Sequence, residues 1–331
     1  MSLLRPLRLG ELIDRSAAFW REHWRPLFAL AVGFQLVQFI LLKVNEVISR
    51  RVFPVLTGDV AALSKANPVE TLSQLVGALG LLVVVALAIL LVSQVAGVAT
   101  THYVYPRLLQ RAGPDLRSSV SLALGRLGTT LLAFLMSVGW TLVVGVGFLL
   151  PGGALCAGGV ALQLSSGAQG VAAVMLILGA VLLGLGFIAL VLWFLIRFLL
   201  TSQVVALEDG GPLHVFRRTD ALSSGRVEGG VDGLVKVRLM ILVTIIGALL
   251  LVVGVVSMIP TAVLGLIYGA SLQPGQTASD VVPPAVLVPA ELLQVILGAL
   301  FAPLYVVFQV VFYVDMRVRR EGLDLELKLA A

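Results

Sequence analysis

The sequence predicts an all-α, polytopic membrane protein: a helical bundle of six transmembrane helices with short amphipathic helices at the membrane surface. Two observations lead to this fold class. First, 59% of the 331 residues are hydrophobic and only 12% are charged, whereas soluble domains have roughly 45–50% apolar and about 25% charged residues. Second, the apolar residues form long uncharged runs, of which the longest extends over 70 residues from Leu127 to Ile196.

The uncharged runs place the six spans in order. A helix made of the longest run would measure about 105 Å, against a hydrocarbon core of ~30 Å, so this run must turn back. Its turn signals are Pro151-Gly152-Gly153 and the Ser- and Gly-rich segment 165–170. The predicted spans lie near Pro26–Leu42, within Thr71–Pro106, near Thr129–Leu150, near Val171–Leu200, from Leu239 to about Tyr268, and near Ala285–Val314. Pro260 and Pro303 should kink the fifth and sixth spans.

The Lys and Arg residues predict the orientation of the spans. With the N-terminus inside, the segments that face the cytoplasm contain 19 of the 23 basic residues. The outer segments contain the other 4, which are Lys43, Arg50, Arg51 and Lys65. This asymmetry follows the positive-inside rule, so both termini are expected in the cytoplasm. The formal net charge of +5 is then expected to attract anionic lipid headgroups on the cytoplasmic side, and we expect no nucleic-acid partner.

A short basic segment precedes each pair of spans, over residues 9–24, 115–127 and 212–226. In the first segment the apolar residues recur at helical spacing and share one face: Leu9, Leu12, Ile13, Ala17, Trp20 and Trp24. This pattern is typical of a helix that lies in the membrane interface. The residues expected at this interface are Arg15, Trp20, Trp24, Arg217, Arg218 and Arg317.

Short matches recur along the chain at intervals of about 100 residues, which is typical of an internal repeat. The dipeptides Arg15-Ser16, Arg117-Ser118 and Arg218-Thr219 follow this interval, and Tyr103–Arg107 resembles Tyr313–Arg317. We therefore predict one membrane domain with a threefold repeat, in units 1–110, 111–210 and 211–331. An alternative is that any alternating topology places a basic helix repeatedly on its inner face.

No catalytic constellation is present in the sequence. His23, His102 and His214 are far apart, and none belongs to a metalloprotease H-E-x-x-H pattern. The single cysteine, Cys156, excludes an intrachain disulfide and a Cys-based metal cluster, and we expect it to be a small packing residue. The glycines of segment 179–186 are expected to allow close helix packing. The sequence therefore predicts no enzyme, no cofactor and no metal site.

Polar side chains inside the spans are the candidate functional residues. Glu291 must be protonated, paired or open to water, and Lys43 is its expected partner. Glu291 is either a cation or proton site at an outward cavity or a carboxylate at the outer interface. Arg197 and Asp315 are expected either to pair or, for Arg197, to snorkel to the interface. Five amides line a polar path or join helices by hydrogen bonds: Gln35, Gln38, Gln94, Gln294 and Gln309.

Three segments carry a family resemblance. They are Leu7–Ser16 with the following Trp20 and Trp24, then Val204–Glu208 with the Arg217-Arg218-Thr219 helix, and Tyr313–Glu326. Together they resemble the glycerophosphoryl diester phosphodiesterase membrane-domain family, a group of bacterial polytopic membrane proteins. The resemblance implies a multi-pass protein of the bacterial plasma or inner membrane. In some relatives a fused phosphodiesterase domain carries the catalysis, and because we expect no such domain here, the resemblance gives no catalytic residues.

Three functions remain open from the sequence. The favoured one is a non-catalytic membrane module that organises lipid or scaffolds a membrane or cytoplasmic protein. The second is a transporter or channel for a small solute or ion. The third is a membrane enzyme that acts on lipid.

Overall fold

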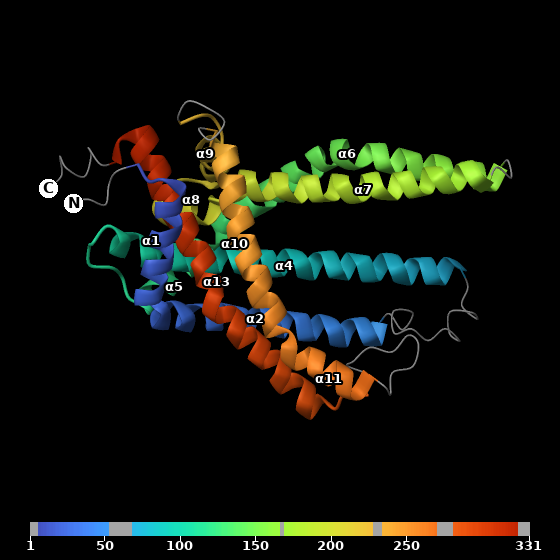
Figure 1. The fold of residues 1–331 in the computed structure, drawn as a ribbon, viewed down its shortest axis with the longest axis horizontal. Coiled ribbons are helices and arrows are strands. Elements are labelled where there is room, and N and C mark those ends of the chain that lie inside the picture. Colours follow the sequence, from blue (N-terminus) through green and yellow to red (C-terminus); the bar gives the residue numbers. More distant parts are fainter. Residues whose placement is uncertain (1–5, 53–67, 166–168, 228–233, 270–280, 324–331) are drawn as a thin grey trace. The chain divides into compact units, whose positions relative to one another are not determined.

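The computed structural model describes residues 6–52, 68–165, 169–227, 234–269 and 281–323. Apart from an isolated bridge between Arg226 and Leu234, the regular secondary structure of these residues is helical. The helices, drawn in Figure 1, are α1 (Leu9–Glu22), α2 (Trp24–Val52), α4 (Pro68–Leu108), α5 (Leu116–Gly125), α6 (Leu127–Ser165), α7 (Gln169–Phe198), α8 (Thr201–Leu207), α9 (Pro212–Ser223), α10 (Val235–Ser257), α11 (Ile259–Gly269) and α13 (Pro284–Glu321). The basic residues Arg5, Lys65 and Lys328 lie outside the described residues.

The predicted number of spans is confirmed. Six helical segments of the described chain are long and apolar enough to cross a membrane: α2, α4, α6, α7 with α8, α10 and α13. Many of their large apolar side chains are exposed, including Leu142 at 68% and Leu251 at 66%. Such surfaces are stable in lipid and costly in water, since apolar contact with water is what folding normally removes. The fold is that of an all-α, multi-pass membrane protein.

The chain divides into two compact units. Unit 1 consists of Met1–Gly125 and Thr244–Ala331, and unit 2 consists of Arg126–Val243. The division passes through α10, whereas the predicted repeat boundaries lie after residues 110 and 210. The threefold repeat therefore stays a prediction.

The short helices nevertheless pack in a regular way. Within unit 1, α5 contacts the end of α4 and α1 contacts α13, and within unit 2, α9 contacts α7. Each short helix thus meets an even-numbered span, and α1 meets the last one. The buried face of each short helix includes one hydroxyl side chain that is 0% exposed, namely Ser16, Ser119 or Thr219.

Unit 2 corrects one turn prediction. Helix α6 continues through Pro151-Gly152-Gly153 to Ser165 instead of turning there. A proline removes one intrahelical hydrogen bond, which membrane helices tolerate when neighbouring groups compensate. The second predicted turn segment, residues 165–170, includes residues 166–168, which lie outside the described residues. At ~1.5 Å per residue, the 39 residues of α6 extend over about 58 Å, longer than the hydrocarbon core.

The glycines of α6 and α7 bring these two helices together. A Cβ atom built on Gly152 would lie 2.6 Å from the backbone nitrogen of Leu183, and one on Gly179 would lie 2.6 Å from Cys156 Sγ. A Cβ atom on Gly186 would collide with the carbonyl oxygen of Phe148. Close backbone approach of this kind is how membrane helices associate without a hydrophobic driving force. The packing roles predicted for Cys156 and for the glycines at 179 and 186 are confirmed, whereas Gly184 of the same segment has no atom within 4 Å of its Cβ position and does not share this role.

The fifth span breaks where proline predicts it. Helix α10 ends at Ser257, and α11 begins at Ile259, directly before Pro260. The sixth span behaves differently, since α13 is continuous through Pro289 and Pro303. It ends at Gly322, whose φ of 66° is the left-handed conformation that glycine adopts at a helix C-terminus.

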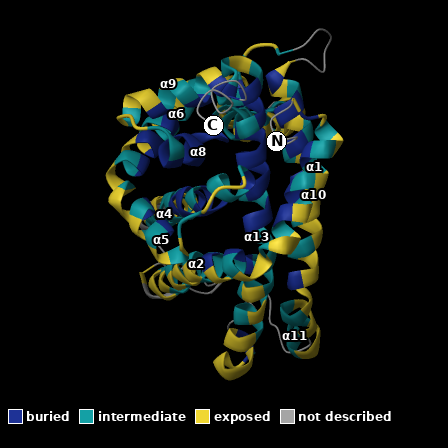
Figure 2. Cartoon of the chain, turned by 90° about the vertical axis from the view of Figure 1, so that its left-hand side faces the viewer, coloured by how far each residue is buried: buried dark blue, intermediate teal, exposed yellow. Residues whose placement is uncertain are grey.

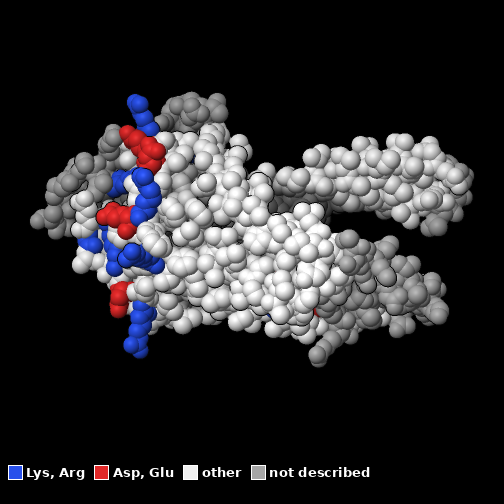
Figure 3. Space-filling view, turned by 60° about the horizontal axis from the view of Figure 1, so that its bottom comes forward, with Lys and Arg blue, Asp and Glu red and all other residues white. Residues whose placement is uncertain are grey.

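Buried residues are unevenly distributed among the helices. Figure 2 shows the dark blue, buried residues concentrated in α8 and in the C-terminal half of α13. Half of the most apolar stretch of α13 is buried, against 11% for α2, because α13 contacts α1, α2, α4 and α11. Within unit 1, charged side chains gather where α4 and α13 end, and the Tyr105 and Tyr313 rings bring these two ends together. Figure 3 shows blue and red side chains beside a largely white surface. We call this part of unit 1, marked by Arg107 and Arg317, the basic end.

Candidate functional site

Arg197 has a different partner from the one considered in the sequence. Within unit 2, its guanidinium Nη2 lies 2.9 Å from Asp220 of α9. The Trp193 and Trp140 rings lie 5.0 and 5.8 Å from its Cζ atom, within the range of cation–π attraction. Arg197 and Asp315 belong to different units, so their pairing stays a prediction, while Asp220 is the partner of Arg197 within unit 2. Asp220 is closer in sequence, and the packing of α9 on α7 brings it to Arg197.

Asp315 of α13 links the two ends of unit 1 in sequence, because it binds the backbone of Leu7 near the N-terminus. It is 1% exposed and accepts a hydrogen bond of 2.8 Å from the backbone N–H of Leu7. Arg319 donates to both Asp315 carboxylate oxygens at 3.0 Å and to the Leu7 carbonyl at 2.8 Å. A buried carboxylate is stable when it is both paired and hydrogen-bonded, and Asp315 is both.

Glu291 is paired, as one of the sequence alternatives requires. Lys43 of α2 lies 2.6 Å from the Glu291 carboxylate and 2.8 Å from that of Glu46. The Glu291 side chain is 22% exposed and that of Lys43 29%, so the cluster is half-buried. One ammonium therefore serves two carboxylates, and together they join α2 to α13.

The intramembrane amides contribute contacts between and within helices. Gln38 of α2 donates a hydrogen bond of 2.9 Å to Ser93 of α4. Gln309 is buried and hydrogen-bonds to Tyr305, one turn earlier in α13. Gln294 is half-buried, one turn after Glu291. These contacts agree with the alternative in which the amides join helices by hydrogen bonds.

The predicted interfacial face of α1 differs from its packing face. The structure buries Leu12, Ser16 and Phe19, whereas Trp20 is only half-buried. Trp20 donates a hydrogen bond of 3.1 Å to the Leu300 carbonyl of α13. Trp24, predicted to continue the apolar face, begins α2 and is 42% exposed. The apolar residues of this segment thus extend beyond the face of α1 that packs against other helices.

Two of the predicted interfacial arginines, Arg218 of α9 and Arg317 of α13, form ion pairs with carboxylates. In unit 2, Arg218 donates through Nε to both oxygens of Glu208, at 3.0 and 2.9 Å. Arg217, its neighbour, lines a small surface pocket. In unit 1, Arg317 donates to Glu321 at 2.8 Å. Glu208 and Asp220 were not predicted as site residues, since acidic residues after a span also occur in ordinary loops.

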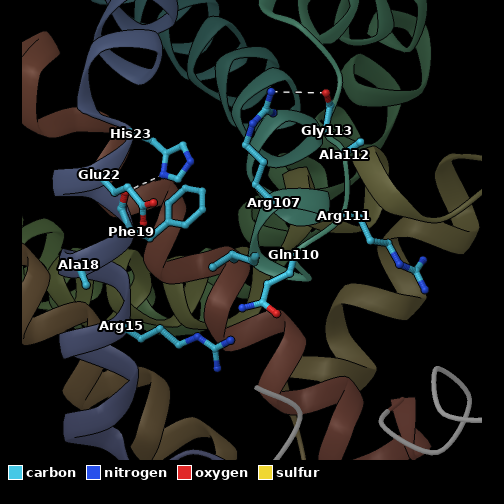
Figure 4. A pocket seen from close by; sticks show the side chains of 11 residues that line it. Arg15, Ala18, Phe19, Glu22, His23, Arg107, Gln110, Arg111, Ala112 and Gly113 are labelled. Carbon is cyan, nitrogen blue, oxygen red and sulfur yellow. Dashed lines mark hydrogen bonds between the residues drawn. The ribbon is translucent and has the colours of Figure 1, made fainter. Parts of the chain in front are cut away.

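A cavity of about 550 Å³ lies in unit 1 between α1 and the end of α4 (Figure 4). Its lining includes three arginines, Arg15, Arg107 and Arg111, but a single acidic residue, Glu22. The cavity therefore carries a net positive charge. Burial lowers the pKa of the Arg15 guanidinium, because a cation that loses water is less stable in its charged form.

Two of these arginines differ in their contacts. Arg107 donates to the carbonyls of Tyr103 and Pro114 at 2.7 and 2.9 Å, and its Cζ atom lies 3.6 Å from the Tyr103 ring centroid. A Cβ atom on Gly113 would lie 2.6 Å from Arg107, so glycine at this position makes room for the guanidinium. Arg111, by contrast, is exposed, and its side chain makes no hydrogen bond or ion pair with another described residue. Arg107 shapes the cavity, and Arg111 is free to bind an anion.

Among the described residues, no group of three or more His, Cys, Asp or Glu side chains is placed to hold a metal ion. Fold and charge distribution define the class as a multi-pass, all-α membrane protein with a basic end. Comparison of the chain with family models, curated proteins and solved structures finds no match. The resemblance to the phosphodiesterase membrane-domain family thus stays a prediction.

Proposed function

We propose that this protein is a non-catalytic membrane module that binds anionic lipid headgroups at its basic end, with that end and both termini facing the cytoplasm. The observation that carries the proposal is the basic cavity between α1 and α4, with three arginines and one carboxylate in its lining. Arginine presents a rigid, permanently charged fork that suits phosphate oxygens.

The position of the cavity in the chain supports the same ligand. Arg15 lies on a short helix outside the six spans, and Arg111 follows the end of the second span. Both residues thus flank segments that enter the membrane, where phosphate groups of lipid are the most abundant anions. Basic residues near such a surface attract anionic lipid with about 1 kcal/mol each.

Lipid binding to the purified protein tests the proposal. Native mass spectrometry in mild detergent would measure adducts of phosphatidylglycerol and of phosphatidylcholine at equal concentration. We expect phosphatidylglycerol to bind preferentially, and we expect Arg111→Gln and Arg15→Gln each to weaken it about fivefold, equivalent to about 1 kcal/mol. Arg21→Gln is the matched control, because Arg21 is an exposed arginine of α1 that does not line the cavity.

Competition identifies the source of the phosphate. If glycerol 3-phosphate displaces phosphatidylglycerol at equal concentration, the cavity binds a free phosphate ester and not a lipid. Equal binding of both lipids, or equal effects of Arg21→Gln and Arg111→Gln, contradicts the proposal.

A further inference from the structure

A second hollow lies in unit 1, between α2 and α5, and its lining is almost entirely apolar. Its volume is about 680 Å³. Leu30, Gly33 and Val37 line it from α2, and Arg117, Val120 and Leu124 line it from α5. Arg117 is the one ionisable residue in this lining. We call this hollow the α2–α5 groove.

We propose that the α2–α5 groove holds an acyl chain of an anionic phospholipid whose phosphate binds Arg117. The inference rests on the proposed function, because it names the lipid component that the basic end would recognise. It adds a second contact, to the hydrocarbon part of the lipid, at residues separate from the basic cavity.

The packing of α5 leaves its apolar side open toward the groove. The sequence places Leu116, Val120, Ala123 and Leu124 at helical spacing, and of these the structure buries only Ala123, together with Ser119. Leu124 stays 55% exposed. A short helix that turns small residues to the protein and large apolar residues outward needs an apolar environment on its outer side, and lipid supplies one.

The groove begins near the membrane surface and continues along a span. Its α2 residues, Ala29 to Val37, lie 5 to 13 positions after Trp24, where the first span begins, and therefore roughly 8 to 20 Å along the helix. Arg117 lies outside the spans, before the beginning of the third one at Leu127. A cation outside the spans and an apolar channel within one match the polar head and the tail of a phospholipid.

The Arg117 side chain is open to an anion from outside the chain. It is exposed and forms no hydrogen bond or ion pair with a described residue. The nearby Asp115 carboxylate attracts Arg117 electrostatically, but it accepts its hydrogen bond of 2.7 Å from Ser118. Arg117 thus contrasts with Arg107, whose guanidinium is occupied by backbone carbonyls.

Gly33 offers a way to fill the groove without disturbing the fold. No atom lies within 4 Å of a Cβ built on Gly33, so a larger side chain would enter the groove. Gly33→Leu should block it, and Val37→Trp is a second occluding variant on the same face. Gly80→Leu is the matched control, since Gly80 of α4 also has open space around it and does not line the groove.

Photo-crosslinking in nanodiscs of phosphatidylcholine tests the proposal. The probe is phosphatidylglycerol with a diazirine in one acyl chain, and labelled peptides are located by mass spectrometry. We expect label over residues 30–37 and 116–124, at least tenfold less of it in Gly33→Leu and Val37→Trp, and no change in Gly80→Leu. Arg117→Gln should reduce labelling by phosphatidylglycerol several-fold and leave labelling by the matching phosphatidylcholine probe unchanged.

Two outcomes overturn the proposal. Label spread evenly over exposed span residues such as Leu142, or groove labelling that survives both occluding variants, shows no specific chain site. Loss of groove labelling in a stable dimer shows that a second copy covers the groove. If groove labelling fails while Arg111→Gln still lowers the preference for phosphatidylglycerol, the proposed function stands and the acyl-chain site in the groove is rejected. If the groove is labelled as expected but Arg111→Gln leaves the lipid preference unchanged, the basic cavity is rejected as the lipid site and the groove stands.

Discussion

The two units hold their long helices together by different chemistry. In unit 1, Lys43 with Glu291 joins α2 to α13, and Gln38 with Ser93 joins α2 to α4. Asp315 and Arg319 of α13 bind the Leu7 backbone, which precedes α1. In unit 2, α6 and α7 meet through glycines, and the ion pairs lie where the helices end. Lipid tails are as apolar as leucine, so helices in a membrane need either close backbone contact or polar bonds. This chain uses one solution in each unit.

The largest effect is expected from breaking the polar link that Asp315 makes in unit 1. Asp315→Asn removes the charge that Arg319 faces and leaves a guanidinium that is only 8% exposed without its counter-charge. Loss of one partner of a buried ion pair costs about 3–5 kcal/mol. Unfolding of the purified protein in mixed micelles with increasing denaturing detergent measures the change. Asp14→Asn, at an exposed position of α1, is the control, and equal stability of both variants contradicts the described link.

The next effect tests the glycine packing of unit 2. Gly186→Ala places a methyl group against the Phe148 carbonyl, and overpacking of this kind costs about 1–3 kcal/mol. Gly184→Ala is the matched control two residues away, with no atom within 4 Å of its Cβ position. The control should gain up to about 1 kcal/mol from the higher helix propensity of alanine. The same unfolding experiment should give opposite signs, and equal signs would show that α6 and α7 are not in close contact.

A smaller effect is expected at the half-buried cluster of α2 and α13. Lys43→Gln removes the cation that Glu46 and Glu291 share, which should destabilise the protein by about 1 kcal/mol. Glu291→Gln should cost less, about 0.5 kcal/mol, because Lys43 keeps Glu46. If Glu291→Gln is the more damaging variant, the carboxylate has a role beyond this ion pair, and ion flux into liposomes is then the measurement to make.

The smallest effect concerns the single hydrogen bond between Gln38 of α2 and Ser93 of α4. Gln38→Leu removes the donor to Ser93, and such bonds between membrane helices contribute about 0.6 kcal/mol on average. The loss should be additive with Glu291→Gln, since the two contacts join α2 to different helices. A coupling above roughly 0.5 kcal/mol in the double variant would show that unit 1 responds as one polar network.

The number of spans could be predicted from the sequence because it depends on composition, whereas several contacts between helices could not because they depend on packing. Six spans follow from the uncharged runs, because a segment enters the membrane when the transfer of its side chains from water to lipid is favourable. The Lys43–Glu291 contact was also accessible, since alternating topology puts both residues at the same end of their spans. The turn at Pro151 was wrong, because Pro-Gly-Gly signals a turn in water but serves helix packing in a membrane. The binding of Leu7 by Asp315 was not accessible, because a backbone N–H carries no sequence signature.

The link made by Asp315 has a consequence for the order in which the protein is made. The hydrogen bond from the Leu7 backbone to Asp315 joins residues that are 308 positions apart, and the whole of unit 2 is synthesised between them. Unit 2 can therefore fold as soon as it is inserted, whereas the first two spans wait in the membrane for their final neighbour. During that interval α2 and α4 lack their contacts with α13. Misfolding or degradation during biogenesis is therefore expected first at α2 and α4, the spans that are synthesised first.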